Sequence, residues 1–271
     1  MTDSTDQIQL AIFDWAGTTI DFGSCAPAAA FRKVFAAHGV EASDHAARAP
    51  MGLNKREHLV RMLQTETIAQ QWLAANGKAW TEDDVSRLYE EFIPYQLQAI
   101  EESSKLVPGL NEVVQHLRQH NIRIGGTTGY FKAAAEATAA AAREQGFVPD
   151  ANICADDVPE GRPAPWMIYE VMKQLTIYPA RCVVKIGDTV ADIEAGHNAG
   201  CWTVGVCDSS SSTGLSYEDF QQQTAAEQQE RIASTMRVFK DVGSHFTIGS
   251  LEELPVVIQK INQRMAQGER P

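Results

Sequence analysis

The sequence predicts an α/β protein: a doubly wound parallel-sheet, Rossmann-like core into which an all-helical cap domain is inserted. Two observations support this. Short apolar runs typical of buried parallel strands alternate along the chain with segments of helical periodicity. No strand-like alternation occurs between residues 26 and 102, so this stretch is expected to be helical. The predicted core domain comprises residues 1–21 and 104–271, and the predicted cap domain comprises residues 22–103.

Each expected strand and helix rests on a local pattern. Apolar runs that end in polar or glycine-containing turns predict strands. They are expected at residues 9–13, 122–126, 152–154, 182–186 and 202–206, with a last edge strand at 246–248. Apolar residues at helical spacing, bounded by glycine or proline, predict helices. They are expected from residue 26 to Gly39, from 53 through Trp72, and at 81–102, 110–119, 132–144, 166–175 and 189–200. Residues 207–244 are expected to form a peripheral loop and a surface helix.

The 271-residue chain has the composition of an ordinary globular protein, with 44% hydrophobic and 21% charged residues. Its net charge of −12 argues against binding to nucleic acid or to an anionic membrane surface. The five cysteines are odd in number, scattered and without a C-x-x-C pair, which indicates reduced thiols. The polar N-terminus shows no signal-peptide pattern, and no apolar run is long enough to span a membrane. These features predict a cytoplasmic protein without nucleic-acid or membrane partners.

Polar residues at the ends of three predicted strands define a candidate site. Asp14 follows the first strand, Thr128 and Gly129 follow the second, and Asp188 follows a later one. Because ligands of open α/β sheets bind beyond the carboxyl ends of the strands, these residues are expected to converge. Asp14 and Asp188 can share a hard cation such as Mg²⁺, while a hydroxyl and the N–H groups of a glycine turn suit phosphate oxygens. Arg162, in a proline-rich turn, offers a planar cation for the same phosphate.

Three motifs at these strand ends resemble the haloacid dehalogenase superfamily of phosphotransferases. They are DWAGT at 14–18, TTGY at 127–130 and GDTVAD at 187–192. The resemblance implies that Asp14 is a nucleophile that becomes an aspartyl phosphate, and that Thr128 holds the phosphoryl group. It also implies that Asp188 and Asp192, which share a helical face, bind or orient Mg²⁺. The expected metal ligands are Asp14, the backbone carbonyl of Ala16 and Asp188, with Asp192 in a supporting position.

One position departs from the phosphatases of that superfamily, which usually carry a second Asp two residues after the nucleophile as an acid/base. Here that position is Ala16, so ordinary ester hydrolysis would lack its proton donor. The helical insert supplies another reactive group, because Lys55 in PMGLNKREH is a candidate amine nucleophile for a carbonyl. Met51 lies four residues before Lys55 and His58 three residues after it, so all three share a face if the helix begins early.

The stretches DWAGTTIDFGS, PMGLNK, TTGY, PEGRPAPWM and GDTVAD, in this order, closely resemble the phosphonoacetaldehyde hydrolase family. The resemblance implies a small phosphonate substrate whose aldehyde forms a Schiff base with Lys55. The departing group is then carbon, which explains why position 16 needs no Asp. Tyr130 is expected to support the site, and a homodimer through cap helices is implied. Some members have Cys where this chain has Ser24, with Cys25 next, so a thiol role stays open.

The cap is expected to move about hinges near Phe22 and Ser104 and to bring Lys55 over Asp14. Two other functions stay open: a Mg²⁺-dependent phosphatase or phosphotransferase acting on an ester, and a catalytically silent scaffold that binds a phosphorylated metabolite. Simpler roles also exist for single residues. Asp14 can cap a turn, and Asp192 can orient its neighbours. Lys55 and His58 can lie on a solvated face, Tyr130 can pack in the core, Arg162 can form a helix-start salt bridge, and Lys185 can point outward from its strand.

Overall fold

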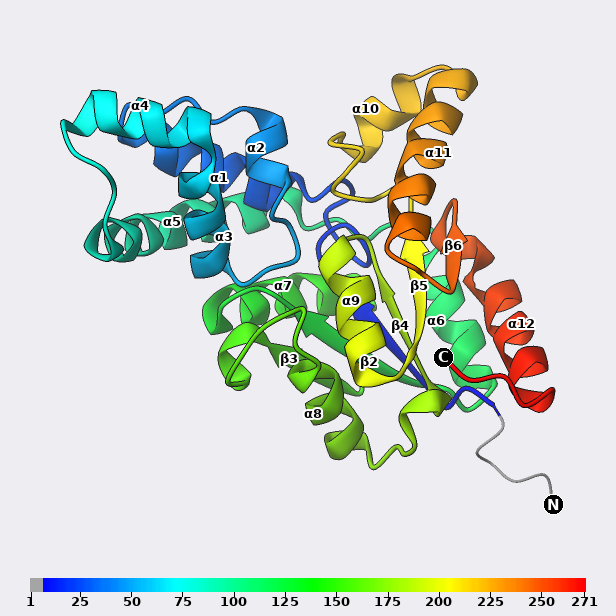
Figure 1. The fold of residues 1–271 in the computed structure, drawn as a ribbon. Helices are drawn as coiled ribbons and strands as arrows, with labels where there is room; N and C mark the ends of the chain where they lie inside the picture. Colours follow the sequence, from blue (N-terminus) through cyan, green and yellow to red (C-terminus); the bar gives the residue numbers. More distant parts are fainter. Residues whose placement is uncertain (1–6) are drawn as a thin grey trace.

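The computed structural model describes residues 7–271, and its core is a six-stranded parallel sheet in the order β3-β2-β1-β4-β5-β6 (Figure 1). The direction in which strands are added reverses between β1 and β4, which is where open α/β sheets bind their ligands. The predicted doubly wound core is therefore confirmed. The strands are β1 (Leu10–Asp14), β2 (Arg123–Thr128), β3 (Ala151–Cys154), β4 (Val183–Gly187), β5 (Trp202–Val206) and β6 (Phe246–Ile248).

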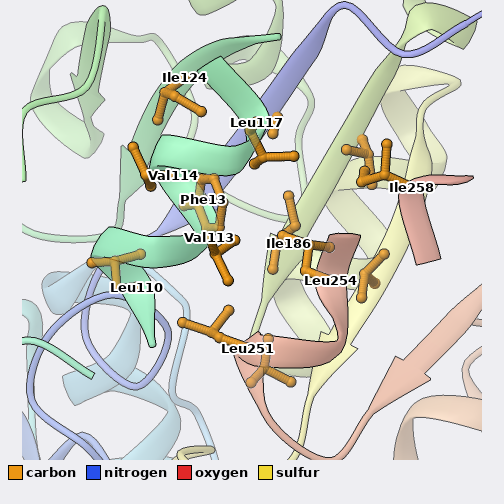
Figure 2. Packing of buried hydrophobic residues seen from close by; sticks show 14 of the residues in the cluster. Phe13, Leu110, Val113, Val114, Leu117, Ile124, Ile186, Leu251, Leu254 and Ile258 are labelled. Atoms are coloured by element: carbon orange, nitrogen blue, oxygen red, sulfur yellow. The ribbon is translucent and has the colours of Figure 1, made fainter. Parts of the chain in front are cut away.

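Helices cover both faces of the sheet, which is why its central strands are apolar on both sides. In β1, Ala11 and Phe13 point into one apolar cluster, whereas Leu10 and Ile12 point into another on the opposite face. Figure 2 shows the first cluster, where Phe13 packs among side chains of α6 and α12. The helices of the core are α6 (Leu110–Gln119), α7 (Lys132–Glu144), α8 (Trp166–Leu175), α9 (Val190–Ala199), α10 (Tyr217–Gln222), α11 (Ala225–Asp241) and α12 (Leu254–Ala266).

A separate group of helices, which we call the cap, lies beside the carboxyl ends of the strands (Figure 1). It has its own apolar core, built around Phe31, Trp72 and Phe92, and this core meets the sheet domain at Phe131 and the start of α7. The connections to the core run next to each other, because Asp21 N–H donates to the Lys105 carbonyl at 3.0 Å. The cap helices are α1 (Cys25–Ala37), α2 (Asp44–Arg48), α3 (Lys55–Gln64), α4 (Glu66–Asn76) and α5 (Glu82–Ser103).

Three local features differ from the sequence-based expectations or add to them. The short helix α2 and the terminal helix α12 were not expected. Helix α3 begins at Lys55, with Asn54 as its N-cap, because the Asn54 side chain accepts from Glu57 N–H at 2.9 Å. Met51 therefore lies in the preceding turn and not on the helical face of Lys55. No helix within residues 7–271 is long and apolar enough to cross a membrane.

Candidate active site

Asp14 lies at the carboxyl end of β1 and is held by Arg162. The guanidinium Nη2 donates to Asp14 Oδ1 and, at 2.9 Å, to the carbonyl of Thr127, the residue beside Asp14 on β2. The other guanidinium nitrogen, Nη1, lies 2.8 Å from Asp192 Oδ1. Both Asp14 and Arg162 are buried. Burial raises the pKa of Asp14, whereas the charge of Arg162 opposes that rise. Arg162 is thus more than a helix-start salt bridge, because it fixes the orientation of the Asp14 carboxylate.

Asp188 and Asp192 complete a buried acidic cluster with Asp14, and one oxygen of each lies within 4.8 Å of the others. Asp188 accepts from Thr18 Oγ1 at 3.3 Å and from Ser211 N–H at 2.8 Å. Burial, followed by the nearby charges of Asp14 and Asp192, raises the pKa of Asp188 well above its usual range. A divalent cation bound between such carboxylates offsets the repulsion between their negative charges.

Asp192 is less free than the other two carboxylates to bind a metal. Its Oδ1 lies 2.8 Å from both Arg162 Nη1 and Lys185 Nζ, and its Oδ2 accepts from Thr189 Oγ1 at 2.6 Å. These partners lower the pKa of Asp192 against the effect of burial. The donor set left for a hard cation is all oxygen, from Asp14 and Asp188. Ala16 lines a pocket together with Asp14. The residues present therefore fit a Mg²⁺-like ion.

The alternative of an outward-pointing strand position for Lys185 is wrong. Lys185 does not point out of the sheet but is fully buried, and its Nζ pairs with Asp192 and donates to the Ile186 carbonyl at 3.1 Å. Helix α9 comes close to this strand at Gly196, where an added Cβ would lie 3.2 Å from Lys185 Cβ. The strand pattern alone gave no signal for this pairing, because the partner comes from the following helix.

The cap contributes Lys55 to the same pocket that Asp14 lines. Its Nζ lies 5.0 Å from the ring centre of Tyr130 and 5.5 Å from that of Phe31, and its side chain is 5% exposed. Desolvation is the main cause that lowers the pKa of Lys55 from 10.5 to about 8, with Arg162 adding to the effect and Asp14 opposing it. The solvated-face alternative for Lys55 is therefore excluded, and its amine is partly neutral near pH 8.

His58 lies one turn beyond Lys55 but inside the cap and not among the residues that line the pocket. Its ring stacks on Phe31 with centroids 3.7 Å apart, and its Nε2 lies 2.9 Å from the Ala47 carbonyl. Burial, together with the charge of Lys55, lowers the pKa of His58 well below 6.5. The ring is therefore neutral, with Nε2 donating. In the part of the chain that the structure describes, its buried Nδ1 has no hydrogen-bond partner.

The remaining expected residues gather around the same pocket, which is lined by residues of both the cap and the core. Thr128 Oγ1 accepts from Tyr130 N–H at 3.1 Å, and Gly129 passes so close to the cap that an added Cβ would lie 2.6 Å from the Leu53 carbonyl. Ser24 lines the pocket, whereas Cys25 does not. Sequence reasoning assigned no role to four further pocket residues, for which the local motifs carried no distinct signal. The pocket is lined by Asp14, Ala16, Ser24, Pro27, Met51, Gly52, Leu53, Lys55, Thr128, Gly129, Tyr130, Arg162 and Thr189; those missed are Pro27, Gly52, Leu53 and Thr189.

The fold and the acidic cluster define a hydrolase of the haloacid dehalogenase type, and the chain belongs to the haloacid dehalogenase-like hydrolase family, whose model matches residues 8–200. The names of similar relatives denote a narrower group of proteins than the family model does. A phosphonoacetaldehyde hydrolase of Bacillus cereus is 41% identical over 258 residues, which cover 95% of this chain and 98% of the relative. A phosphonoacetaldehyde hydrolase of Syntrophobacter fumaroxidans is 38% identical and covers 98% of this chain and 96% of its own length.

A solved structure is similar over nearly the whole chain. The phosphonoacetaldehyde hydrolase like protein of Oleispira antarctica has a TM-score of 0.96 and 41% identity, and the match covers 97% of this chain and 96% of that one. The resemblance seen in the sequence motifs is therefore confirmed, both for the superfamily and for the phosphonoacetaldehyde hydrolases within it.

Proposed function

We propose that this protein hydrolyses the carbon–phosphorus bond of phosphonoacetaldehyde and releases acetaldehyde and phosphate. The observation that carries the proposal is the presence of a buried lysine, Lys55, in the same small pocket as the strand-end carboxylate Asp14. The position two residues after Asp14 is Ala16, which has no proton to give to an ester oxygen. The names of the similar relatives support the same substrate.

The proposed reaction begins at Lys55. Its neutral amine attacks the aldehyde carbon and, with loss of water, forms a protonated imine. Asp14 then attacks phosphorus, and the electron pair of the breaking carbon–phosphorus bond moves into the imine to give an enamine. Protonation of the enamine carbon and hydrolysis of the imine release acetaldehyde and restore Lys55. A second water hydrolyses the aspartyl phosphate, and phosphate leaves.

The other residues bind, shield or position the reacting groups. Arg162 holds Asp14 for attack, and Thr128 and Gly129 offer a hydroxyl and backbone N–H groups to phosphonate oxygens. Met51 and Tyr130 keep water away from the Lys55 amine, and His58 supports α3 from within the cap.

Mg²⁺ is the cofactor in this proposal, held by Asp14, the carbonyl of Ala16 and Asp188, with Asp192 in support. The bound ion supplies positive charge between the anionic phosphonate and the anionic Asp14. Exhaustive chelation is expected to abolish turnover, and added Mg²⁺ is expected to restore it. Full activity in metal-free protein would contradict this assignment.

The decisive experiment compares two substrates. Phosphonoacetaldehyde and a generic phosphate ester are supplied to the same preparation, and acetaldehyde and phosphate are both measured. Acetaldehyde and phosphate in equal amounts from the phosphonate, with little release from the ester, supports the proposal. Rapid ester hydrolysis without acetaldehyde release would favour the phosphatase alternative. Binding without turnover of either would favour the silent scaffold.

We also propose that residues 22–103 form a mobile cap on the core of residues 1–21 and 104–271, with hinges near Phe22 and Ser104. The pocket supports this, because cap residues such as Lys55 and core residues such as Asp14 line it together, so that movement of the cap would open it. A cytoplasmic homodimer is proposed as well. The scattered cysteines, with no C-x-x-C pair, are consistent with reduced thiols in a reducing compartment. The dimer contact is placed on the cap helices, where Leu73 of α4 is an exposed apolar side chain. Light scattering of the purified protein tests the dimer.

A further inference from the structure

Arg48, the last residue of α2, joins the cap to a serine-rich loop of the core, residues 207–215. Its Nη1 donates to the Gly23 carbonyl at 2.5 Å and to the Ser211 carbonyl at 3.3 Å, and its Nη2 donates to the Gly214 carbonyl at 3.3 Å. Its Nε pairs with Asp44 at 2.7 Å, and the side chain is 11% exposed. One forked cation therefore ties α2 to a hinge and to two points of a core loop.

The same loop contacts Asp188, the carboxylate that is proposed to bind the metal. Ser210 Oγ donates to the Asp188 backbone carbonyl at 2.7 Å, and Ser211 N–H donates to Asp188 Oδ2 at 2.8 Å. Ser209 Oγ donates at 2.7 Å to the carbonyl of Gly17, in the turn that follows Asp14. All three serines are buried, so these bonds are shielded from water. The loop thus sets where the Asp188 carboxylate points.

Ser211 is the residue at which the two sets of contacts meet. Its carbonyl accepts from Arg48 of the cap, and its N–H donates to Asp188 of the core. The hinge adds a second contact, since Gly23 N–H donates to the Ser209 carbonyl at 2.8 Å. An added Cβ at Gly23 would lie 2.0 Å from the Leu215 carbonyl, so the hinge and the loop fit against each other without room for a side chain. A movement of α2 therefore acts on the loop that holds Asp188.

We propose that Arg48 is a positioning residue that couples closure of the cap to the metal-binding geometry of Asp188 through Ser211. The inference rests on the proposed metal site and extends it, because it gives that site a connection to the cap. Coupling of this kind is reciprocal: a closed cap strengthens metal binding, and a bound metal favours the closed cap by the same factor. Arg48 touches no reacting group and acts only through the loop.

The test measures metal binding and cap closure without substrate, with Mn²⁺ as the probe. Free Mn²⁺ is quantified by electron paramagnetic resonance to give the dissociation constant. Hydrogen exchange of the hinge residues 22–24 and of the loop residues 207–215 is followed with and without the ion. Arg48→Ala is expected to weaken Mn²⁺ binding about fivefold or more, the lower end of typical allosteric couplings. It is also expected to abolish the Mn²⁺-induced protection of residues 22–24. Arg48→Lys, which keeps the charge but not the fork, is expected to fall between the wild type and Arg48→Ala.

Arg61→Ala is the matched control. Arg61 pairs with Glu57 one turn earlier in α3, as Arg48 does with Asp44 in α2, but the Arg61 side chain is exposed on the cap. The control is expected to leave Mn²⁺ affinity and exchange unchanged. Thermal unfolding identifies any variant that does not fold, and Arg48→Lys then carries the test if Arg48→Ala is lost. Wild-type Mn²⁺ affinity in folded Arg48 variants would overturn the proposal. Neither readout uses phosphonoacetaldehyde, so failure of the proposed reaction would be seen separately.

Discussion

Lys55 combines burial with a reactive amine, and its pKa makes a quantitative prediction. The pKa falls from 10.5 to about 8, chiefly because the ammonium loses its hydration. At pH 7 the neutral fraction is then about 300-fold larger than for a free lysine, or about 9% against about 0.03%. Imine formation needs this neutral amine. We therefore expect borohydride with acetaldehyde to inactivate the protein at a rate that rises with pH and levels off above about pH 8.

Substitution at Lys55 separates an imine from a purely electrostatic role. Lys55→Arg keeps a cation but cannot form the imine, so it is expected to be as inactive as Lys55→Ala. Mass spectrometry of the reduced adduct is expected to locate the added mass on Lys55. Lys33→Met, at an exposed lysine on α1, is the control and is expected to change neither trapping nor turnover. Substantial turnover by Lys55→Arg, or an inactivation rate that keeps rising to pH 10, would refute the reasoning.

The same pKa predicts a gain in stability when Lys55 is replaced by methionine. The folded state holds the proton of Lys55 less tightly than the unfolded state, at about 8 against 10.5. Below pH 8 both states are protonated, and the buried charge costs the folded state up to about 3 kcal/mol. From pH 8 to 10.5 the folded state releases its proton first, so wild-type stability rises with pH across this window. Lys55→Met is thus expected to be more stable in urea at pH 7, with an advantage that shrinks toward pH 10.5.

Three further predictions concern the acidic cluster. Asp14→Asn is expected to stay folded and to lose more than about 10⁴-fold in turnover, because the amide cannot act as the nucleophile; circular dichroism and phosphate release check this. Asp188→Ala is expected to weaken Mg²⁺ binding more than Asp192→Ala does, as titration with the ion would show. Asp192→Ala deprives two buried cations of a shared carboxylate and is expected to cost about 3–5 kcal/mol of unfolding free energy. Lys185→Met is expected to lower the free energy of unfolding in urea by less, about 2 kcal/mol, because Asp192 still pairs with Arg162. An unchanged free energy of unfolding would mean that Lys185 is not needed to balance the charge of Asp192.

The strands and the strand-end residues could be predicted because their signals are local. An apolar run that stops at a polar residue identifies both a strand and its functional end, as at Asp14 and Asp188. Helix α12 also has a local signal, although it was not expected, since Leu254, Ile258 and Ile261 are spaced as on one helical face. Each of these features lies within a few residues of chain.

The features that could not be predicted depend on contacts between different helices, strands and loops of the folded chain. Helix α2 spans only Asp44–Arg48, too short to be stable by itself, and it is fixed through the contacts of Arg48 with the core. The buried position of Lys185 depends on Asp192 of the next helix. The lowered pKa of Lys55 likewise depends on its burial beside the rings of Phe31 and Tyr130, which come from other parts of the chain.

The contact between Gly129 and the Leu53 carbonyl has a consequence for how sequence variation would be tolerated. Gly129 has an ordinary backbone conformation, so alanine there would not strain the chain itself; its methyl group would meet the cap. In the proposed open form that obstacle disappears. A variant library sorted for folded protein would therefore retain alanine at this position, while one sorted for growth on the substrate would discard it. The difference between the two libraries would outline, residue by residue, the surface on which the cap comes to rest.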